Sequence, residues 1–162
     1  MTQSLPKTSH TMPRTRTSKL GGVSATTSSR MSKVAQRDTA GERALRRELH
    51  CRGLRFRLHR PVVEGTRRTV DILLVAARIA VFVDGCFWHG CPQHGTLPKN
   101  NAEWWRRKIE ANITRDRDTT TRLEASGWHV IRVWEHEPPK AAADRIAQAV
   151  GPALADEHRY PP

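Results

Sequence analysis

The segment VDILLVAARIAVFVD, residues 70–84, decides the fold. It holds two runs rich in Val, Ile and Leu, 70–75 and 79–83, which are separated by only three residues. Runs of this length and composition are typical of strands buried on both faces, and the short separation predicts a hairpin. We expect this hairpin at the centre of a sheet, with Asp71 inside its first strand and Asp84 at the end of its second.

Helical and strand patterns flank the hairpin on both sides. Apolar spacing and Gly53 predict a helix over about 39–52, and alternation from Leu54 to Leu58 predicts a strand that Pro61 ends. Downstream we expect an amphipathic helix over about 102–125 closed by Gly127, a strand over 128–134 and a helix over about 139–149. The predicted order is α-β-β-β-α-β-α, which is an α/β fold.

Length and charge limit the kind of protein. The 162 residues suffice for one domain with a tail, and no stretch approaches the ~18 apolar residues of a membrane helix, so we expect a soluble protein. Lys and Arg number 28 against 16 Asp and Glu, which gives a net charge of +12. A surface this positive predicts a polyanionic partner.

Composition also divides the chain. Residues 1–30 hold 13 Ser or Thr and no acidic residue, which predicts a disordered basic arm or a misassigned start, with a transit peptide as the alternative. The folded domain is expected over 31–150, with a flexible tail over 151–162. Three cysteines, an odd number, and no secretory signal favour a reducing compartment, for which the cytoplasm is the default.

Carboxylates occupy positions where a metal is expected. Asp71 and Asp84 lie on neighbouring strands, and two such carboxylates make a hard, oxygen-rich site suited to Mg²⁺. The alternative is that each caps a turn or pairs with an arginine. Glu42 has its own alternative, because Thr39 and Glu42 form a capping box at the start of the first helix.

Five potential zinc ligands compete for four positions. Four of them fall within nine residues and the fifth follows the last strand; they are Cys86, His89, Cys91, His94 and His136. Soft and borderline ligands at this spacing predict a structural zinc site, the alternative being unligated loop residues. If zinc takes four, we expect His89 to be free for acid–base chemistry, because it is the histidine that lies nearest Asp84 in the chain.

Two adjacent aromatic residues, Phe87 and Trp88, lie inside this loop. One can pack inward while the other wedges between bases, or both can cover the loop. The tryptophans at 104 and 105 follow helical spacing, which is more typical of core than of contact.

The stretch from Val81 to His94, VFVDGCFWHGCPQH, resembles the very-short-patch-repair (Vsr) mismatch endonucleases. The resemblance covers about residues 28–150. It extends to further motifs in the same order, namely RDTAGE at 37–42, RGLRFR at 52–57, Val70-Asp71, NITRDR at 112–117 and GWHVIRVWE at 127–135.

The resemblance implies a restriction-endonuclease-like α/β core, a mixed central sheet flanked by helices, with a zinc-stabilised loop. It implies an enzyme that nicks DNA on the 5′ side of the thymine in a T:G mismatch left by deamination of 5-methylcytosine. Asp71 corresponds to the metal-binding aspartate, Glu42 to the helix glutamate and His89 to a catalytic histidine. Asp84 departs from the best-known member, which has a histidine there.

The family's zinc is held by cysteines and histidine, and its final cysteine is His136 in this chain. The loop is one residue shorter than in the best-known member, so Cys91 and His94 become the middle ligands beside Cys86. Phe87 and Trp88 match aromatic residues that enter the DNA at the mismatch. Met31 matches an N-terminal residue that wedges from the other groove.

The expected mechanism is hydrolytic and requires Mg²⁺ at Asp71 and Asp84, helped by the backbone carbonyl of Val83. Exposed cationic side chains would hold the DNA backbone; they are Arg55, Arg57, Arg106, Arg107 and Lys108. We expect a monomer associated with the nucleoid, and mismatch-repair proteins are candidate partners. Two other readings stay open: a zinc-stabilised DNA-binding module without catalysis, and a restriction-related nickase with another target.

Overall fold

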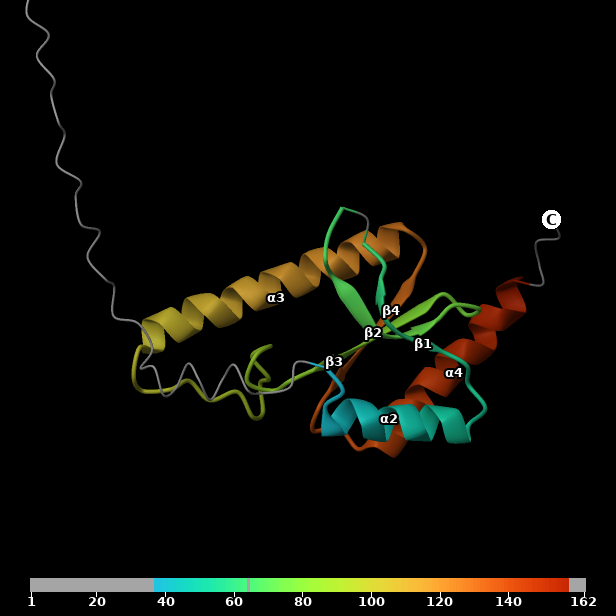
Figure 1. The fold of residues 1–162 in the computed structure, drawn as a ribbon, viewed down its shortest axis with the longest axis horizontal. Helices are drawn as coiled ribbons and strands as arrows, with labels where there is room; N and C mark the ends of the chain where they lie inside the picture. The colour runs from blue at the N-terminus through green and yellow to red at the C-terminus, as the bar shows by residue number, and fades with distance from the viewer. Residues whose placement is uncertain (1–36, 64, 158–162) are drawn as a thin grey trace, which may run out of the picture.

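The computed structural model describes residues 37–63 and 65–157, with side chains described up to residue 151. The elements in chain order are α2 (Ala40–Cys51), β1 (Arg57–Pro61), β2 (Thr69–Leu74), β3 (Ile79–Asp84), α3 (Ala102–Ala125), β4 (His129–Trp134) and α4 (Pro139–Glu157). This order confirms the predicted succession (Figure 1). Met31 and the predicted arm over 1–30 lie outside the described residues, and the domain boundaries stay predictions.

The sheet is mixed, as predicted. Its strand order is β1-β2-β3-β4, with β1–β2 and β2–β3 antiparallel and β3–β4 parallel across the α3 crossover. The central hairpin is confirmed, and its pairs run from Leu74 opposite Ile79 to Ile72 opposite Val81. Asp71 lies beyond that last pair, where β2 and β3 separate.

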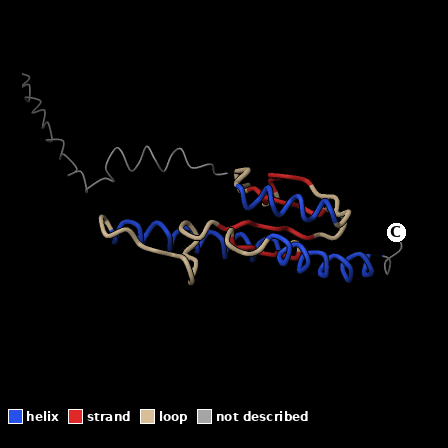
Figure 2. Tube along the Cα trace, turned by 90° about the horizontal axis from the view of Figure 1, so that it is seen from below, coloured by secondary structure: helices blue, strands red, loops and turns tan. Residues whose placement is uncertain are grey.

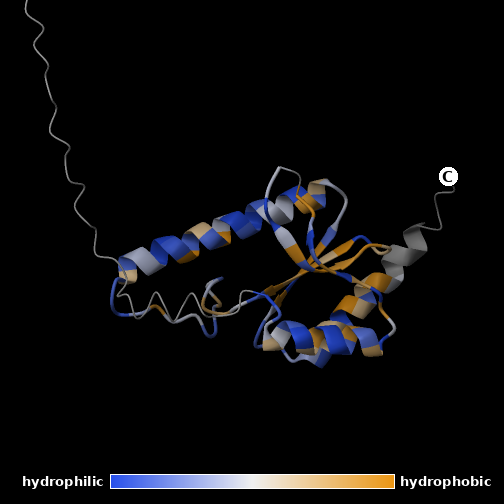
Figure 3. Cartoon of the chain, in the orientation of Figure 1, coloured by the Kyte–Doolittle hydropathy of each residue, from blue (hydrophilic) through white to orange (hydrophobic). Residues whose placement is uncertain are grey.

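Two apolar clusters pack on the two faces of the sheet. The larger joins α2 and α4 to one face through residues such as Leu45, Ile72, Val81 and Ile146. The smaller places Leu123 of α3 against the other face. Figure 3 shows the hydrophobic residues concentrated in the central strands, whereas most of α3 is hydrophilic. The three layers follow from these faces, because each helix can bury only one apolar stripe.

The loop over 85–101 runs beside the N-terminal half of α3, beyond the end of the strands (Figures 1 and 2). Gly90, with a φ of +65°, lies against this helix, and a Cβ there would come within 3.0 Å of Ile113. The close approach and the left-handed backbone both require glycine at this position. The loop is thereby held close against α3.

The first predicted strand begins later than expected. Leu54 and Phe56 pack against the larger cluster, but β1 starts only at Arg57, which pairs with Leu73. Because β2 ends at Leu74, residues before Arg57 have almost no strand left to pair with. The alternation predicted the partial burial of Leu54 and Phe56 correctly, but it was wrong for Leu58, which is 38% exposed, and for the start of the strand.

The last helix is longer than expected. The predicted end at about 149 is wrong, because α4 continues through Gly151 and Pro152 to Glu157. Ala and Leu at 153–155 favour helix strongly enough to continue it after a proline that removes one hydrogen bond. None of the helices in residues 37–63 and 65–157 is long and apolar enough to cross a membrane.

A pair of glycine variants tests the end of α3. Gly127 has a φ of +76° and donates to the Glu124 carbonyl, while Trp128 N–H donates to Leu123, as in a Schellman motif. We expect Gly127→Ala to lower the free energy of unfolding by about 1 kcal/mol. Gly41→Ala, inside α2, where the added Cβ would meet only ordinary contacts of 3.6 Å or more, should raise it by up to ~1 kcal/mol. Urea denaturation measures both, and equal effects would contradict the assignment.

Candidate active site and metal centre

Asp71 occupies the fork where β2 and β3 separate. Its Oδ2 accepts a hydrogen bond of 2.9 Å from the Val83 N–H, so the carboxylate takes the place of a strand carbonyl. Burial, assisted by the charges of Glu42 and Asp84, raises the pKa of Asp71 to about 6. No salt bridge among the described residues includes Asp71. A desolvated carboxylate without a cationic partner is a natural ligand for a divalent ion.

Glu42 has the capping role that the sequence left as an alternative, and its role in the active site stays a prediction. Thr39 caps α2 and accepts from Glu42 N–H over 3.2 Å, as predicted. The Glu42 carboxylate reaches one residue further back than a standard capping box and accepts from Asp38 N–H over 3.0 Å. It is 3% exposed and also pairs with Arg46 at 2.7 Å. A capping glutamate therefore lies close enough to Asp71 for its charge to raise the pKa of that carboxyl group.

A polar group beside Asp71 was missed by sequence reasoning. Ligand atoms of Asp38, Glu42 and His59 lie within 4.8 Å of one another. The Arg46 guanidinium fills the space between them, 3.1 Å from His59 Nε2. His59 has a φ of +48°, which is uncommon for a residue with a Cβ. The only sequence signal was a histidine on the cationic face of a predicted strand.

Asp84 is paired with a residue that the sequence analysis did not single out. Arg132 of β4 binds both carboxylate oxygens of Asp84, through Nε and Nη2, at 2.6 Å each. Asp84 is 5% exposed, so this ion pair is largely withdrawn from water. Mg²⁺ ligation by Asp84 stays a prediction, and it would require the carboxylate to be shared with Arg132.

His89 lies outside the cysteine cluster, as predicted, and faces carboxylates. Its Nδ1 lies 2.6 Å from Asp116 Oδ2 and 3.6 Å from Asp84 Oδ1. Burial alone would lower the pKa of His89, but the Asp116 hydrogen bond and the charges of Asp84 and Asp116 outweigh it and raise the pKa. Because an ionised carboxylate can only accept a hydrogen bond, His89 Nδ1 carries the proton of this contact. The other ring nitrogen, Nε2, takes no part in it. Asp116, on the charged face of α3, was not predicted.

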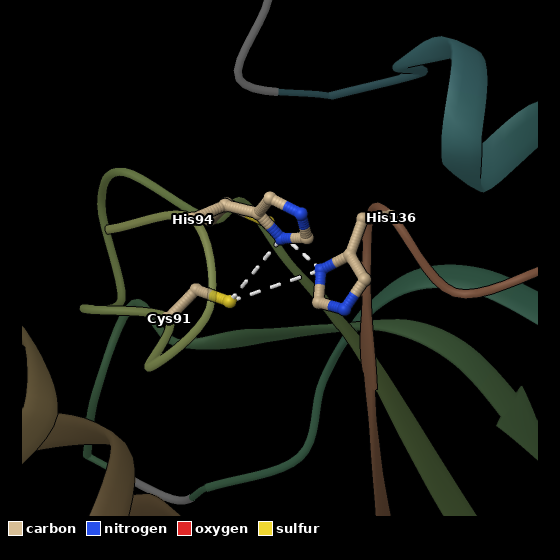
Figure 4. A group of neighbouring side chains, drawn as sticks. Cys91, His94 and His136 are labelled. Atoms are coloured by element: carbon tan, nitrogen blue, oxygen red, sulfur yellow. Dashed lines mark hydrogen bonds between the residues drawn. The ribbon is translucent and has the colours of Figure 1, made fainter. Parts of the chain in front are cut away.

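The four expected zinc ligands meet. Atoms of Cys86, Cys91, His94 and His136 lie within 4.8 Å of one another. Cys91 Sγ lies 3.8 Å from Nδ1 of both His94 and His136 (Figure 4), and Cys86 Sγ lies 3.0 Å from His136 Nδ1. A tetrahedral zinc ion separates sulfur and nitrogen ligands by roughly 3.5 Å. The donor set and spacing fit zinc, whose presence stays a prediction.

Two polar contacts fix the ligand loop to its surroundings. Glu135, at the end of β4, accepts from the Cys86 N–H over 2.6 Å. Asn112, buried on α3, donates to the Trp88 carbonyl over 2.9 Å. Desolvation and the neighbouring Cys91 raise the pKa of the Cys86 thiol to about 11. Both thiols would lose their protons on binding a metal ion.

The aromatic residues of the loop form one cluster with α3. Phe87 lies 5.1 Å from both Trp88 and Trp105, between ring centroids. Trp105 is 3% exposed, as expected for core, whereas Trp104 is 46% exposed and the core interpretation is wrong for it. Base contact by Phe87 and Trp88 stays a prediction.

The predicted DNA-binding cations are all exposed; they are Arg55, Arg57, Arg106, Arg107 and Lys108. Arg106 and Arg107 pair with Glu103 at 2.8 and 3.1 Å, in ion pairs that water screens. Phosphates can therefore compete for both arginines at little cost.

Comparison with known proteins identifies the family. The sequence model described as "DNA mismatch endonuclease Vsr" matches residues 23–94. The DNA mismatch endonuclease Vsr of Escherichia coli K12 is 39% identical over 114 residues, 68% of this chain and 70% of that protein. The chain belongs to the Vsr family.

Other relatives of this Vsr-family chain are named as nicking enzymes. The type II nicking enzyme V.NaeI of Lentzea aerocolonigenes is 41% identical over 115 residues, 69% of each chain. The type II nicking enzyme V.XorIIP of Xanthomonas oryzae pv. oryzae is 45% identical over 109 residues, 66% of this chain and 77% of that one. The mixed sheet with three helices is consistent with the restriction-endonuclease-like fold expected of a Vsr-like endonuclease.

A first prediction concerns the charge of Asp71 in the Vsr-family site. Since its folded pKa of about 6 exceeds the ordinary value of 3.8, the unfolded chain ionises first, and stability falls between about pH 4 and pH 6. Asp71→Asn keeps an acceptor for Val83 N–H and removes the charge. We expect it to raise the free energy of unfolding at pH 7 without divalent ions, by up to ~3 kcal/mol, and to change it little near pH 4.

Asp118→Asn is the matched control. Hydrogen bonds from Arg68 and Arg122 lower the pKa of Asp118, so its charge stabilises the fold above its ordinary pKa. This variant should lower stability at pH 7, the opposite sign. Thermal unfolding from pH 4 to 8 measures both variants, and a pH-independent difference between Asp71→Asn and the wild type would refute the raised pKa.

A second prediction concerns metal content. We expect about one zinc ion per chain by elemental analysis. Cys86→Ser should lose that ion and at least ~5 °C of thermal midpoint, because the ligand cluster ties the loop to β4. Cys51→Ser is the control, since Cys51 is exposed and outside the cluster. Equal metal content in both variants would remove the zinc assignment.

Proposed function

We propose that this Vsr-family endonuclease nicks one strand of duplex DNA on the 5′ side of the thymine in a T:G mismatch. Such mismatches arise when 5-methylcytosine deaminates, so the nick would initiate very short patch repair. Family membership supports the class of reaction. The observation that best supports catalysis is the buried carboxylate of Asp71 where β2 and β3 separate, which forms no salt bridge among the described residues.

Asp71 and the carbonyl of Val83 fit Mg²⁺, because carboxylate and carbonyl oxygens are the hard donors that this ion takes. When bound there, Mg²⁺ supplies a Lewis acid for the scissile phosphate and a water of lowered pKa. Glu42 stays in the proposed site as a charge that Arg46 balances.

His89 supplies the proton. Its Nδ1 is engaged by Asp116, which fixes the ring and leaves Nε2 for a phosphate or leaving-group oxygen. The raised pKa of His89 favours the imidazolium near neutral pH, the form that can donate. Exposed arginines and Lys108 would hold the backbone, and Phe87 with Trp88 would enter the weakly stacked mispair.

The test is a nicking assay on end-labelled duplexes that differ only in T:G versus C:G at one position. We expect a single cut beside the mispaired thymine, with Mg²⁺ and not with EDTA. Asp71→Asn should lower the rate by at least ~10³-fold while retaining DNA binding in EDTA. Undiminished nicking by this variant would refute the site.

A second candidate is a nickase with another target, which the relatives named as type II nicking enzymes favour. Equal cutting of the matched and mismatched duplexes would select it. A DNA-binding module without catalysis is disfavoured, because Asp71 near Asp84 and Glu42 would repel phosphate with no compensating use. Binding of the mismatch with no cutting under any metal would select that module.

A further inference from the structure

Arg132 lies at the centre of the charged groups on the α3 side of the sheet. In the parallel β3–β4 ladder it is the partner of Phe82, and its guanidinium lies 5.1 Å from the centre of that ring. It meets Asp84 in a bidentate pair, with both N···O distances 2.6 Å. The aromatic ring and the paired carboxylate hold the guanidinium in one orientation.

The same guanidinium extends to the histidine dyad. Arg132 Nη2 lies 3.3 Å from Asp116 Oδ2, the oxygen that also bonds His89 Nδ1 at 2.6 Å. Arg132 Nη1 lies 3.5 Å from the Asp116 backbone carbonyl. Asp116 thus receives contacts from a strand residue and from a loop residue. Arg132 is the strand residue, so its position is fixed by the sheet.

The carboxylates of the site differ in their surroundings. Asp84 is 5% exposed and both its oxygens already accept from a cation. Asp71 accepts one backbone N–H and enters no salt bridge among the described residues. A metal ion at Asp84 would have to share a carboxylate oxygen with an Arg132 N–H and lie beside the guanidinium charge, which repels it.

We propose that Asp84 anchors Arg132 instead of binding a metal ion, and that Arg132 is a positioning residue that holds Asp116, and through it His89, for proton transfer. The inference rests on the proposed Mg²⁺-dependent nicking. Asp71 is then the main carboxylate that binds the metal ion. Arg132 acts through its direct contacts with Asp84 and Asp116, which the exposed arginines do not make.

The first experiment measures metal binding without DNA. Thermal midpoints are recorded against Mg²⁺ concentration for the wild type, Asp71→Asn and Asp84→Asn, starting from protein with zinc retained and Mg²⁺ removed. We expect Asp84→Asn to keep the half-saturating Mg²⁺ concentration within ~3-fold, and Asp71→Asn to raise it more than ~10-fold. An increase of ~10-fold in Asp84→Asn would overturn the proposal.

The second experiment is a double-mutant cycle on nicking. Arg132→Gln should lower single-turnover kcat at saturating DNA by more than ~10-fold, with mismatch affinity in EDTA within ~3-fold of wild type. Asp84→Asn combined with Arg132→Gln should be no worse than Arg132→Gln alone, because both act through one contact. Arg132→Lys should recover part of the rate, since it keeps the charge and loses the fork. Additive losses, or a change in DNA affinity alone, would overturn the positioning role.

Controls separate this role from folding and from the proposed function. Arg52→Gln removes another arginine contact, to Asp144 at 2.6 and 2.9 Å between α2 and α4, and should leave kcat unchanged. If a single variant does not fold, the double variant, which leaves no unpaired charge, decides the outcome through its kcat and Mg²⁺ response. A wild type that nicks matched and mismatched DNA equally would refute the mismatch proposal and leave the Arg132 test intact.

Discussion

The proposed active site depends on how the buried carboxylates at one end of the sheet are balanced by cationic side chains. Several carboxylates gather where β2 and β3 separate, in surroundings too dry to leave them uncompensated. Most are balanced by a side chain from another turn or element, in the pairs Glu42 with Arg46, Asp84 with Arg132 and Asp116 with His89. Asp71 alone of these four forms no salt bridge within the described residues, and its burial raises its pKa to about 6. The proposed Mg²⁺ site is therefore placed at the one carboxylate of the four that has no ion-pair partner among the described residues.

The remainder of the fold holds these groups against one another. The α3 crossover carries Asp116 and Asn112 on one side, while β4 carries Arg132 and ends at Glu135. Because β3 and β4 run parallel, their carboxyl ends lie side by side. The ligand loop begins after β3 at this end of the sheet, and His136 follows β4 at the same end. The proposed catalytic groups and the cysteine cluster share one scaffold. Disturbing the loop will therefore displace His89, which lies within it.

The sequence predicted correctly those features that depend on residues close together in the chain. Apolar spacing and Gly127 gave the bounds of α3, and ligand spacing gave the four-residue cysteine and histidine cluster. Asp116 and Arg132 escaped prediction, because their partners depend on the parallel register of β3 with β4 and on where α3 crosses the sheet. The start of β1 was missed for a similar reason, since strand pairing is limited by the length of β2.

The cysteine cluster joins distant parts of the chain. Cys86, Cys91 and His94 are close in sequence, but His136 arrives only after α3 and β4 are in place. An ion held by all four ligands would close a loop of about fifty residues. The three near ligands can capture the ion first, and the fourth can join only when the slow, non-local β3–β4 pairing has formed. If the cluster binds zinc, ligation by His136 would therefore be a late event in folding.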